Sequence, residues 1–228
     1  EQEKVFGFGI NYDYVPEGVH KYMDGNGITG RIFNLGVRGD GYITWRDFPK
    51  RSMFIDPRWD IPSDLLEKIG FARLNAEVLN SLEEKYGFVS ILSGYAGREK
   101  DMPEAFSDTD ISFSHPDWAL VYWDDNSLLY LKKNGIYDPV IKRDEYRFLK
   151  PANDIYSIRT RLFDESFRTG VIRELKRNIT ETDSSRAYAF LGFVYNEIGL
   201  YGEAINAFKN VRDSISDNMI TAYNGMAY

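Results

Sequence analysis

The stretch Gly30–Asp60 constrains the fold most, because it holds two short apolar runs on either side of a polar loop. Arg31–Leu35 and Ser52–Asp56 are predicted to form buried strands. The loop between them contains three glycines and is followed by apolar residues that predict a short helix: Gly36, Gly39, Gly41, then Tyr42, Ile43, Trp45 and Phe48. A polar loop held between two strands is a place where a binding site can lie.

Strand and helix patterns alternate through the first part of the chain. Val5–Ile10 predicts a first strand, and Pro16–Met23 predicts a helix that Gly25 and Gly27 end. The apolar spacing from Ser63 or Asp64 to Tyr86 predicts one long helix. Phe88–Leu92 is continuously apolar, as in strands buried on both faces. This alternation is typical of a mostly parallel sheet covered by helices.

A hairpin is predicted to end this sheet. Ala119–Trp123 and Ser127–Leu131 are β-rich runs separated only by Asp124, Asp125 and Asn126. We therefore predict an α/β domain over residues 1–143, a mostly parallel mixed sheet with helices on both faces and a terminal hairpin. From Asp144 onward strand patterns stop and helical spacing takes over, with Pro151 and Gly170 as predicted breaks. Residues 144–228 are therefore predicted to form a helical region.

Composition narrows the classes of function. The chain of 228 residues is 43% hydrophobic, contains no cysteine and carries a formal net charge of -7. This acidity argues against a nucleic-acid partner. Without cysteine, and with His20 and His115 far apart, the sequence argues against a zinc site and leaves carboxylate-bound cations open; we assign no metal-binding residue and no cofactor. No apolar run reaches the ~20 residues of a membrane helix.

The stretch Ala187–Val211 resembles a tetratricopeptide repeat, a pair of antiparallel helices. The motif positions are occupied by Leu191, Gly192, Tyr195, Gly199, Tyr201, Ala204 and Phe208. Gly192 and Ala204 are small where the two helices would touch. One full repeat is predicted over about 185–217, and Gly225 follows Gly192 by 33 residues, so a second repeat begins before the end.

The resemblance to repeats implies a concave face that binds a protein or peptide. Its lining would consist of Arg186, Phe193, Asn196 and Glu197. The alternative is that the short array braces the α/β domain. We also expect Glu1–Tyr228 to be a fragment of a longer protein, whose cut repeat could drive dimerisation through Met219, Ile220, Tyr223 and Met226.

The segment from Pro16 to Asp60 resembles the extracytoplasmic domain of bacterial multi-pass membrane proteins related to oligosaccharyltransferases and protein mannosyltransferases. The matching positions are Phe33, Asn34, Gly39, Gly41, Tyr42, Trp45, Phe54, Ile55, Asp56 and Arg58. The resemblance implies a non-catalytic part of a membrane-anchored glycosyltransferase-like protein, on the extracytoplasmic side, with repeats at its C-terminus. In such transferases the catalytic carboxylates lie in the membrane region, so no catalytic residue is carried over here.

The polar residues of the central stretch have two interpretations. The candidate site consists of Asn34, Asp40, Tyr42, Trp45, Asp56, Arg58 and Asp60. It could serve a carbohydrate-active or nucleotide-sugar enzyme, or bind a glycan without catalysis. A general acid, however, needs a pKa raised away from cations, and arginines alternate with these carboxylates. The simpler interpretation is that Asp56 and Arg58 pair with each other or cap the loop, and that His20 and His115 lie at the surface or in loops.

Overall fold

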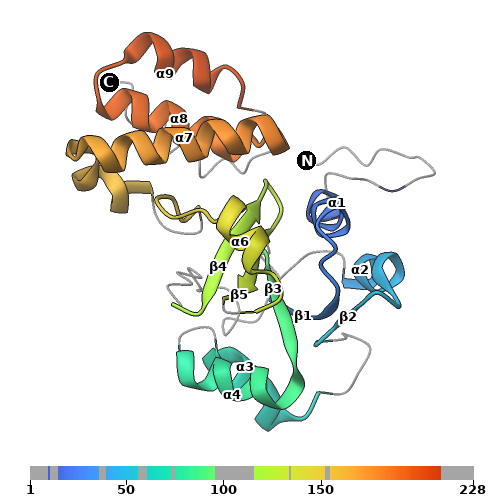
Figure 1. Cartoon of the computed structure of the whole chain (residues 1–228). Helices are drawn as coiled ribbons and strands as arrows, with labels where there is room; N and C mark the ends of the chain where they lie inside the picture. Colours follow the sequence, from blue (N-terminus) through green and yellow to red (C-terminus); the bar gives the residue numbers. More distant parts are fainter. Residues whose placement is uncertain are drawn as a thin grey trace.

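The computed structural model describes residue 10 and residues 15–35, 40–55, 61–72, 75–95, 116–133, 135–151 and 155–211. These residues form a five-stranded mixed sheet with helices, followed by a helical region (Figure 1). The predicted fold class is therefore confirmed. The predicted strand Val5–Ile10 lies outside the described residues apart from Ile10, and so do His115 and the predicted dimer contacts beyond residue 211.

The sheet is parallel on one side and antiparallel on the other. Its strands are β1 (Gly30–Leu35), β2 (Arg51–Met53), β3 (Phe88–Ser93), β4 (Trp118–Trp123) and β5 (Leu128–Lys132), in the order β2-β1-β3-β5-β4. β1 pairs in parallel with β2 and β3, whereas β5 pairs antiparallel with both β3 and β4. β4 therefore runs in the same direction as β3. The turn after β4 lies at the edge of the sheet where β1 and β3 also end.

One face of the sheet is covered by α1 (Glu17–Gly25), α2 (Asp40–Asp47) and α6 (Asp138–Asp144). These helices bury apolar side chains such as Val19, Ile43 and Ile141 against alternate strand residues such as Ile32 and Leu129. Strand alternation makes this possible, because successive side chains point to opposite faces. The sequence patterns did not predict α6, which is short and has only Ile141 buried along its length.

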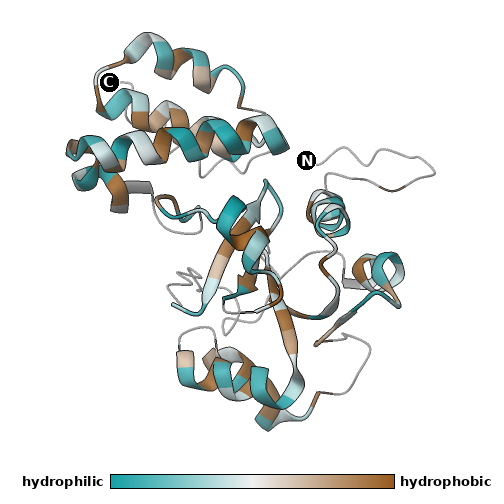
Figure 2. Cartoon of the chain, in the orientation of Figure 1, coloured by the Kyte–Doolittle hydropathy of each residue, from teal (hydrophilic) through white to brown (hydrophobic). Residues whose placement is uncertain are grey.

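The opposite face is covered by α3 (Ser63–Ala72) and α4 (Ala76–Tyr86). The prediction of one long helix was wrong. Asn75 caps α4 instead, because its side chain accepts hydrogen bonds from the backbone N–H groups of Glu77 and Val78. Gly87 ends α4 at φ 66°, a conformation that glycine adopts without steric cost. In Figure 2 the strands of the sheet carry mostly hydrophobic colour, while these helices alternate between both colours.

The helical region contains η1 (Ile155–Phe163), α7 (Glu165–Thr182), α8 (Ser185–Glu197) and α9 (Tyr201–Phe208). Asp164 caps α7 and Ser184 caps α8 through side-chain oxygens that accept a backbone N–H. The predicted break at Gly170 was wrong, because Gly170 lies inside α7. A Cβ at Gly170 would come 2.6 Å from the Phe148 ring, so glycine is required there by packing.

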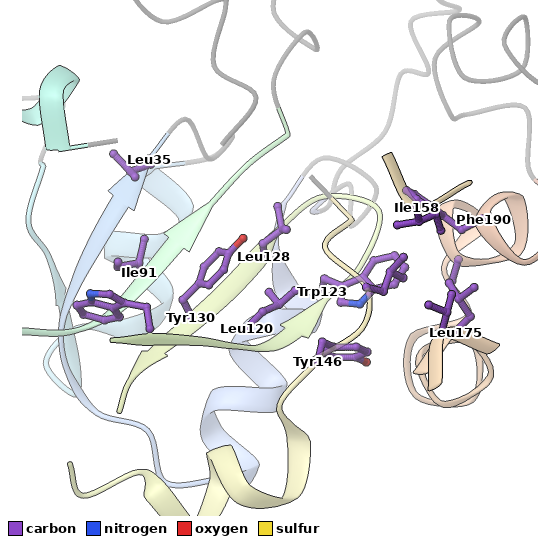
Figure 3. Close-up of a cluster of buried hydrophobic side chains, with 14 of the residues drawn as sticks. Leu35, Ile91, Leu120, Trp123, Leu128, Tyr130, Tyr146, Ile158, Leu175 and Phe190 are labelled. Atoms are coloured by element: carbon purple, nitrogen blue, oxygen red, sulfur yellow. The ribbon is translucent and has the colours of Figure 1, made fainter. Parts of the chain in front are cut away.

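The largest apolar core continues from the sheet into the helical region. Trp123, the last residue of β4, contacts the rings of Tyr146 and Phe190 at centroid distances of 6.0 and 6.5 Å. Figure 3 shows Trp123 and Tyr146 between sheet residues such as Leu120 and helical residues such as Leu175. Among the helices that the structure describes, none has the length and apolar character needed to cross a membrane.

Candidate functional site

The described members of the predicted loop site do not gather around one point. Asn34 is buried, and its side-chain amide donates to the C=O of Ile55 and accepts from its N–H, which ties β1 to the segment that follows β2. Tyr42 donates its hydroxyl to Glu17, and Trp45 on the same helix is 71% exposed. Asp56, Arg58, Asp60 and the side chain of Asp40 lie outside the described residues.

A dense charge cluster joins α1, α2 and β2. Arg51 is almost fully buried and makes two hydrogen bonds to Asp47, with Nε–Oδ2 at 2.9 Å and Nη2–Oδ1 at 2.7 Å. The same Nη2 donates to Asp24 Oδ1 at 2.7 Å, and Arg46 donates to the other oxygen of Asp24 and to Glu17. These pairs connect the three elements through fixed geometry, because guanidinium groups match carboxylates in two-point contacts.

The carboxylates of this cluster are poor proton donors. Burial raises the pKa of Asp24, but hydrogen bonds from Arg46 and Arg51 outweigh it and lower the pKa to about 2. Burial likewise opposes ionisation of Asp47, but contacts with His20 and Arg51 hold its pKa below the ordinary value. General acid catalysis requires the opposite shift. The cluster is therefore suited to holding α1 and α2 together.

His20 lies inside this cluster, so the prediction of a surface or loop position for it was wrong. Its side chain is 0% exposed, and Nδ1 lies 2.7 Å from Asp47 Oδ2. Nε2 has no hydrogen-bond partner within the described part of the chain. His20 precedes the buried Met23 by three residues, a spacing that places both on the same side of α1, which is why His20 is buried.

A second polar region is a cleft of about 550 Å³ between α1, the end of β4, α6 and the end of α7. Its aromatic and charged lining includes Lys21, Tyr22, Tyr122, Asp124, Asp144 and Glu181. The cleft lies at the sheet edge where β4 ends, and α7 brings residues of the helical region to it.

Asp124 lines this cleft. Its Oδ1 accepts hydrogen bonds from the backbone N–H groups of Asn126 and Ser127 at 2.8 Å, and its Oδ2 accepts the Tyr122 hydroxyl at 2.8 Å. Burial raises the pKa of Asp124 above its ordinary value, although these hydrogen bonds partly oppose the shift. A Cβ at Gly18 would lie 2.4 Å from the Tyr122 hydroxyl, so only glycine fits above this pair.

Asp144 and Glu181 also line the cleft and differ in their partners. Asp144 accepts the Tyr22 hydroxyl at 2.6 Å and two bonds from Arg143. Burial opposes ionisation of Asp144, but these donors keep its pKa below the ordinary value. Glu181 Oε1 lies 3.8 Å from Arg177 Nε. Burial raises the pKa of Glu181 and the nearby Asp144 adds to the shift, while Arg177 and Tyr146 oppose it.

The predicted concave face of the repeat is engaged within the chain itself. Phe193 is fully buried, and the Arg186 guanidinium lies 3.7 Å from the ring centre of Tyr95. Glu197 accepts a hydrogen bond from Arg159 of η1 at 2.6 Å, and Asn196 is half-buried. Arg186 thus contacts the α/β domain and Glu197 contacts η1.

Sequence reasoning missed the cleft entirely. Asp124 was interpreted only as a turn residue, and its neighbours in space come from helices that no local pattern connects to it. The sole available signal was the position of Asp124 directly after a buried strand. Within the described residues, no group of three or more histidine or acidic side chains could hold a metal ion.

Comparisons of this chain with protein-family models, with curated proteins and with solved structures found no match. The candidate sites therefore stand on their geometry alone.

Proposed function

We propose that this chain is a non-catalytic, extracytoplasmic module of a membrane-anchored glycosyltransferase-like protein. In this proposal, the α/β domain anchors the first unit of a tetratricopeptide array, and the array holds a protein partner. The sequence resemblance supports the cellular setting. The contacts of α8 support the anchoring role, and they are the observation on which the proposal rests.

The anchor consists of polar contacts between the hairpin and the helical region. Asp125, in the hairpin turn, accepts the Ser184 hydroxyl at 2.6 Å and the backbone N–H groups of Ser185 and Arg186 at 3.0 and 2.8 Å. A carboxylate at a helix N-terminus satisfies free N–H groups and interacts favourably with the helix dipole. Asn178 of α7 donates to the backbone oxygen of Trp123 at 2.7 Å.

The outer side of α9 supports continuation of the array. Tyr201 and Ile205 are 65% and 55% exposed, and their spacing of four places them on one side of the helix. In repeat arrays each helical pair is buried by the next. Because the repeat pattern recurs at Gly225, we assign this side of α9 to the next repeat of the same chain. Later repeats would then present the free concave surface that α8 does not.

Distances between spin labels test the anchoring role. The chain has no cysteine, so labels can be placed at Lys68→Cys on α3 and Glu203→Cys on α9. We expect one narrow distance distribution that Asp125→Ala broadens and the control Glu165→Ala, at an exposed residue of α7, leaves unchanged. A broad distribution in the unmodified chain would contradict the proposal.

Photo-crosslinking in the parent protein tests the partner. A crosslinker placed in the repeats after residue 211 should give a discrete adduct with another protein in intact membranes. The same group at Lys176, on the exposed side of α7, is the control and should give none. Equal adducts from both positions, or none from the repeats, would argue against partner binding by the array.

A further inference from the structure

The cleft between α1, β4, α6 and α7 has no part in the anchoring role. Its volume of about 550 Å³ lies within the range of small-molecule sites, roughly 300–1,000 Å³. Four separate elements contribute to it, including α7 from the helical region. A molecule bound there would touch both parts of the chain at once.

The lining of the cleft is held in place by the protein's own hydrogen bonds. The Tyr22 hydroxyl is fixed on Asp144, and the Tyr122 hydroxyl is fixed on Asp124. The two tyrosine rings pack against each other at a centroid distance of 5.0 Å. Side chains locked in this way lose little entropy when a ligand binds.

Charges of both signs face the cleft. Lys21 and Arg143 carry positive charge, and Asp144 and Glu181 carry negative charge. Asp124 also lines the cleft, but its two oxygens already accept hydrogen bonds from the N–H groups of Asn126 and Ser127 and from the Tyr122 hydroxyl. A phosphate would be attracted by Lys21 and Arg143 but repelled by Asp144 and Glu181. An amine would be attracted by the carboxylates but repelled by the cations. A neutral molecule with several hydroxyl groups meets neither penalty, because each hydroxyl can accept from a cation and donate to a carboxylate.

We propose that the cleft binds a neutral carbohydrate of roughly one or two sugar rings. Asp144 and Glu181 accept hydrogen bonds from sugar hydroxyls, and Lys21 and Arg143 donate to them. The half-buried ring of Tyr22 packs against the apolar side of a sugar. The cleft residues act as a binding site only, and no bond is broken there.

Amide chemical shifts of the intact chain test this proposal. The probes are glucose, galactose, mannose and N-acetylglucosamine with their disaccharides, and the comparison ligands are inorganic phosphate, putrescine and glycine. We expect at least one sugar to give saturable shifts at the amides of Gly18, Lys21 and Thr182. Saturable shifts from phosphate, putrescine or glycine, with none from any sugar, would overturn the assignment.

Two conservative variants test whether these chemical-shift changes arise from binding to the residues that line the cleft. Glu181→Gln removes the charge and keeps the shape, and Tyr22→Phe removes the hydroxyl that fixes Asp144. Each should weaken sugar binding about tenfold, because a hydrogen bond to a charged group is lost or misplaced. Glu165→Gln, at the other end of α7, is the matched control. Unchanged affinity in both variants, with far-UV circular dichroism confirming their fold, would refute the proposal. The spin-label distances do not depend on this outcome, so the two proposals can fail separately.

Discussion

The carboxylates of the described residues differ in their partners. Asp24, which is exposed, and Asp47, which is buried, both have arginine partners, and the pKa values of both lie below the ordinary value. Asp124 and Glu174 are bonded mainly to backbone N–H groups or a hydroxyl, and burial raises their pKa. Asp24 and Asp47 therefore favour folding at neutral pH. Ionised Asp124 and Glu174 lower the stability of the fold at neutral pH, and protonation of these groups restores it.

Arg51→Met should be strongly destabilising. The methionine fills the space but leaves Asp47 buried without its cation, and breaking a buried ion pair from one side costs about 3–5 kcal/mol. Urea unfolding followed by circular dichroism measures the change. The neighbour Lys50, whose side chain is 66% exposed, provides the control Lys50→Met, which we expect to change stability by less than about 0.5 kcal/mol. Equal effects of the two substitutions would contradict the role assigned to Arg51.

Asp124→Asn should change the pH dependence of stability. Asparagine keeps an oxygen for the N–H groups of Asn126 and Ser127 but cannot ionise. In the native chain the folded pKa of Asp124 lies above its unfolded value near 3.8, so stability is gained as pH falls through the folded pKa toward 3.8. The variant lacks this gain. We therefore expect the variant to be at least as stable as the native chain at neutral pH, and to lose that relative advantage on acidification.

Free energies of unfolding at a series of pH values measure this difference. A difference that stays constant from neutral pH to about 4 would show that Asp124 does not titrate across that range as proposed.

At the scale of elements, the packing of α8 against α9 requires the backbone at Gly192 to lie close to the Phe208 ring. A Cβ at Gly192 would lie 2.5 Å from the Phe208 ring, whereas a Cβ at Gly202 meets no atom within 4 Å. The two glycines therefore have opposite effects on stability. Gly192 is required by helix packing, and Gly202 only weakens α9.

Gly192→Ala should destabilise the chain by about 1–3 kcal/mol, because the added methyl group overpacks the contact with Phe208. Gly202→Ala should instead stabilise it by up to about 1 kcal/mol, because alanine is the better helix former. Thermal and urea unfolding of both variants measure the pair. A loss of similar size in both would mean that Gly192 and Phe208 do not make the contact described.

The sequence predicted elements well where apolar runs were long and bounded by turn residues. The hairpin, β1 and β3 were found within a residue or two of their observed ends. The break between α3 and α4 was missed because the apolar spacing continues across it, and only the capping side chain of Asn75 reveals it. The same limit applies to Gly170, whose role depends on Phe148, a residue distant in sequence.

The candidate site was less predictable than the fold. The loop residues were selected because they are close in sequence. The described ones lie in different places: Asn34 bonds Ile55, Tyr42 bonds Glu17, and Trp45 is exposed. The cleft residues Lys21, Asp124, Asp144 and Glu181 meet only after the sheet and α7 have packed. No local sequence pattern predicts that these residues lie close together, because their positions depend on tertiary packing.

At the scale of the whole molecule, the α/β domain and the helical region share one apolar core. Trp123 and Tyr146 lie between them, and Leu175, Phe190 and Phe193 of α7 and α8 are buried in the same cluster. If the helical region unfolded alone, it would expose Trp123 and leave Asp125 without its partners. Both effects oppose independent unfolding, so folding of the two parts is coupled.

We therefore predict one cooperative unfolding transition for the chain. Tryptophan fluorescence reports on Trp123 and the other tryptophans, and a fluorophore at Glu203→Cys reports on α9, because the chain has no other cysteine. Their urea midpoints should coincide with each other and with that of circular dichroism. Asp125→Ala removes the acceptor for Ser184 and the first N–H groups of α8, so it should shift all three midpoints together to lower urea. Separate midpoints in the native chain would show that the two parts unfold independently and that the shared core around Trp123 does not couple them.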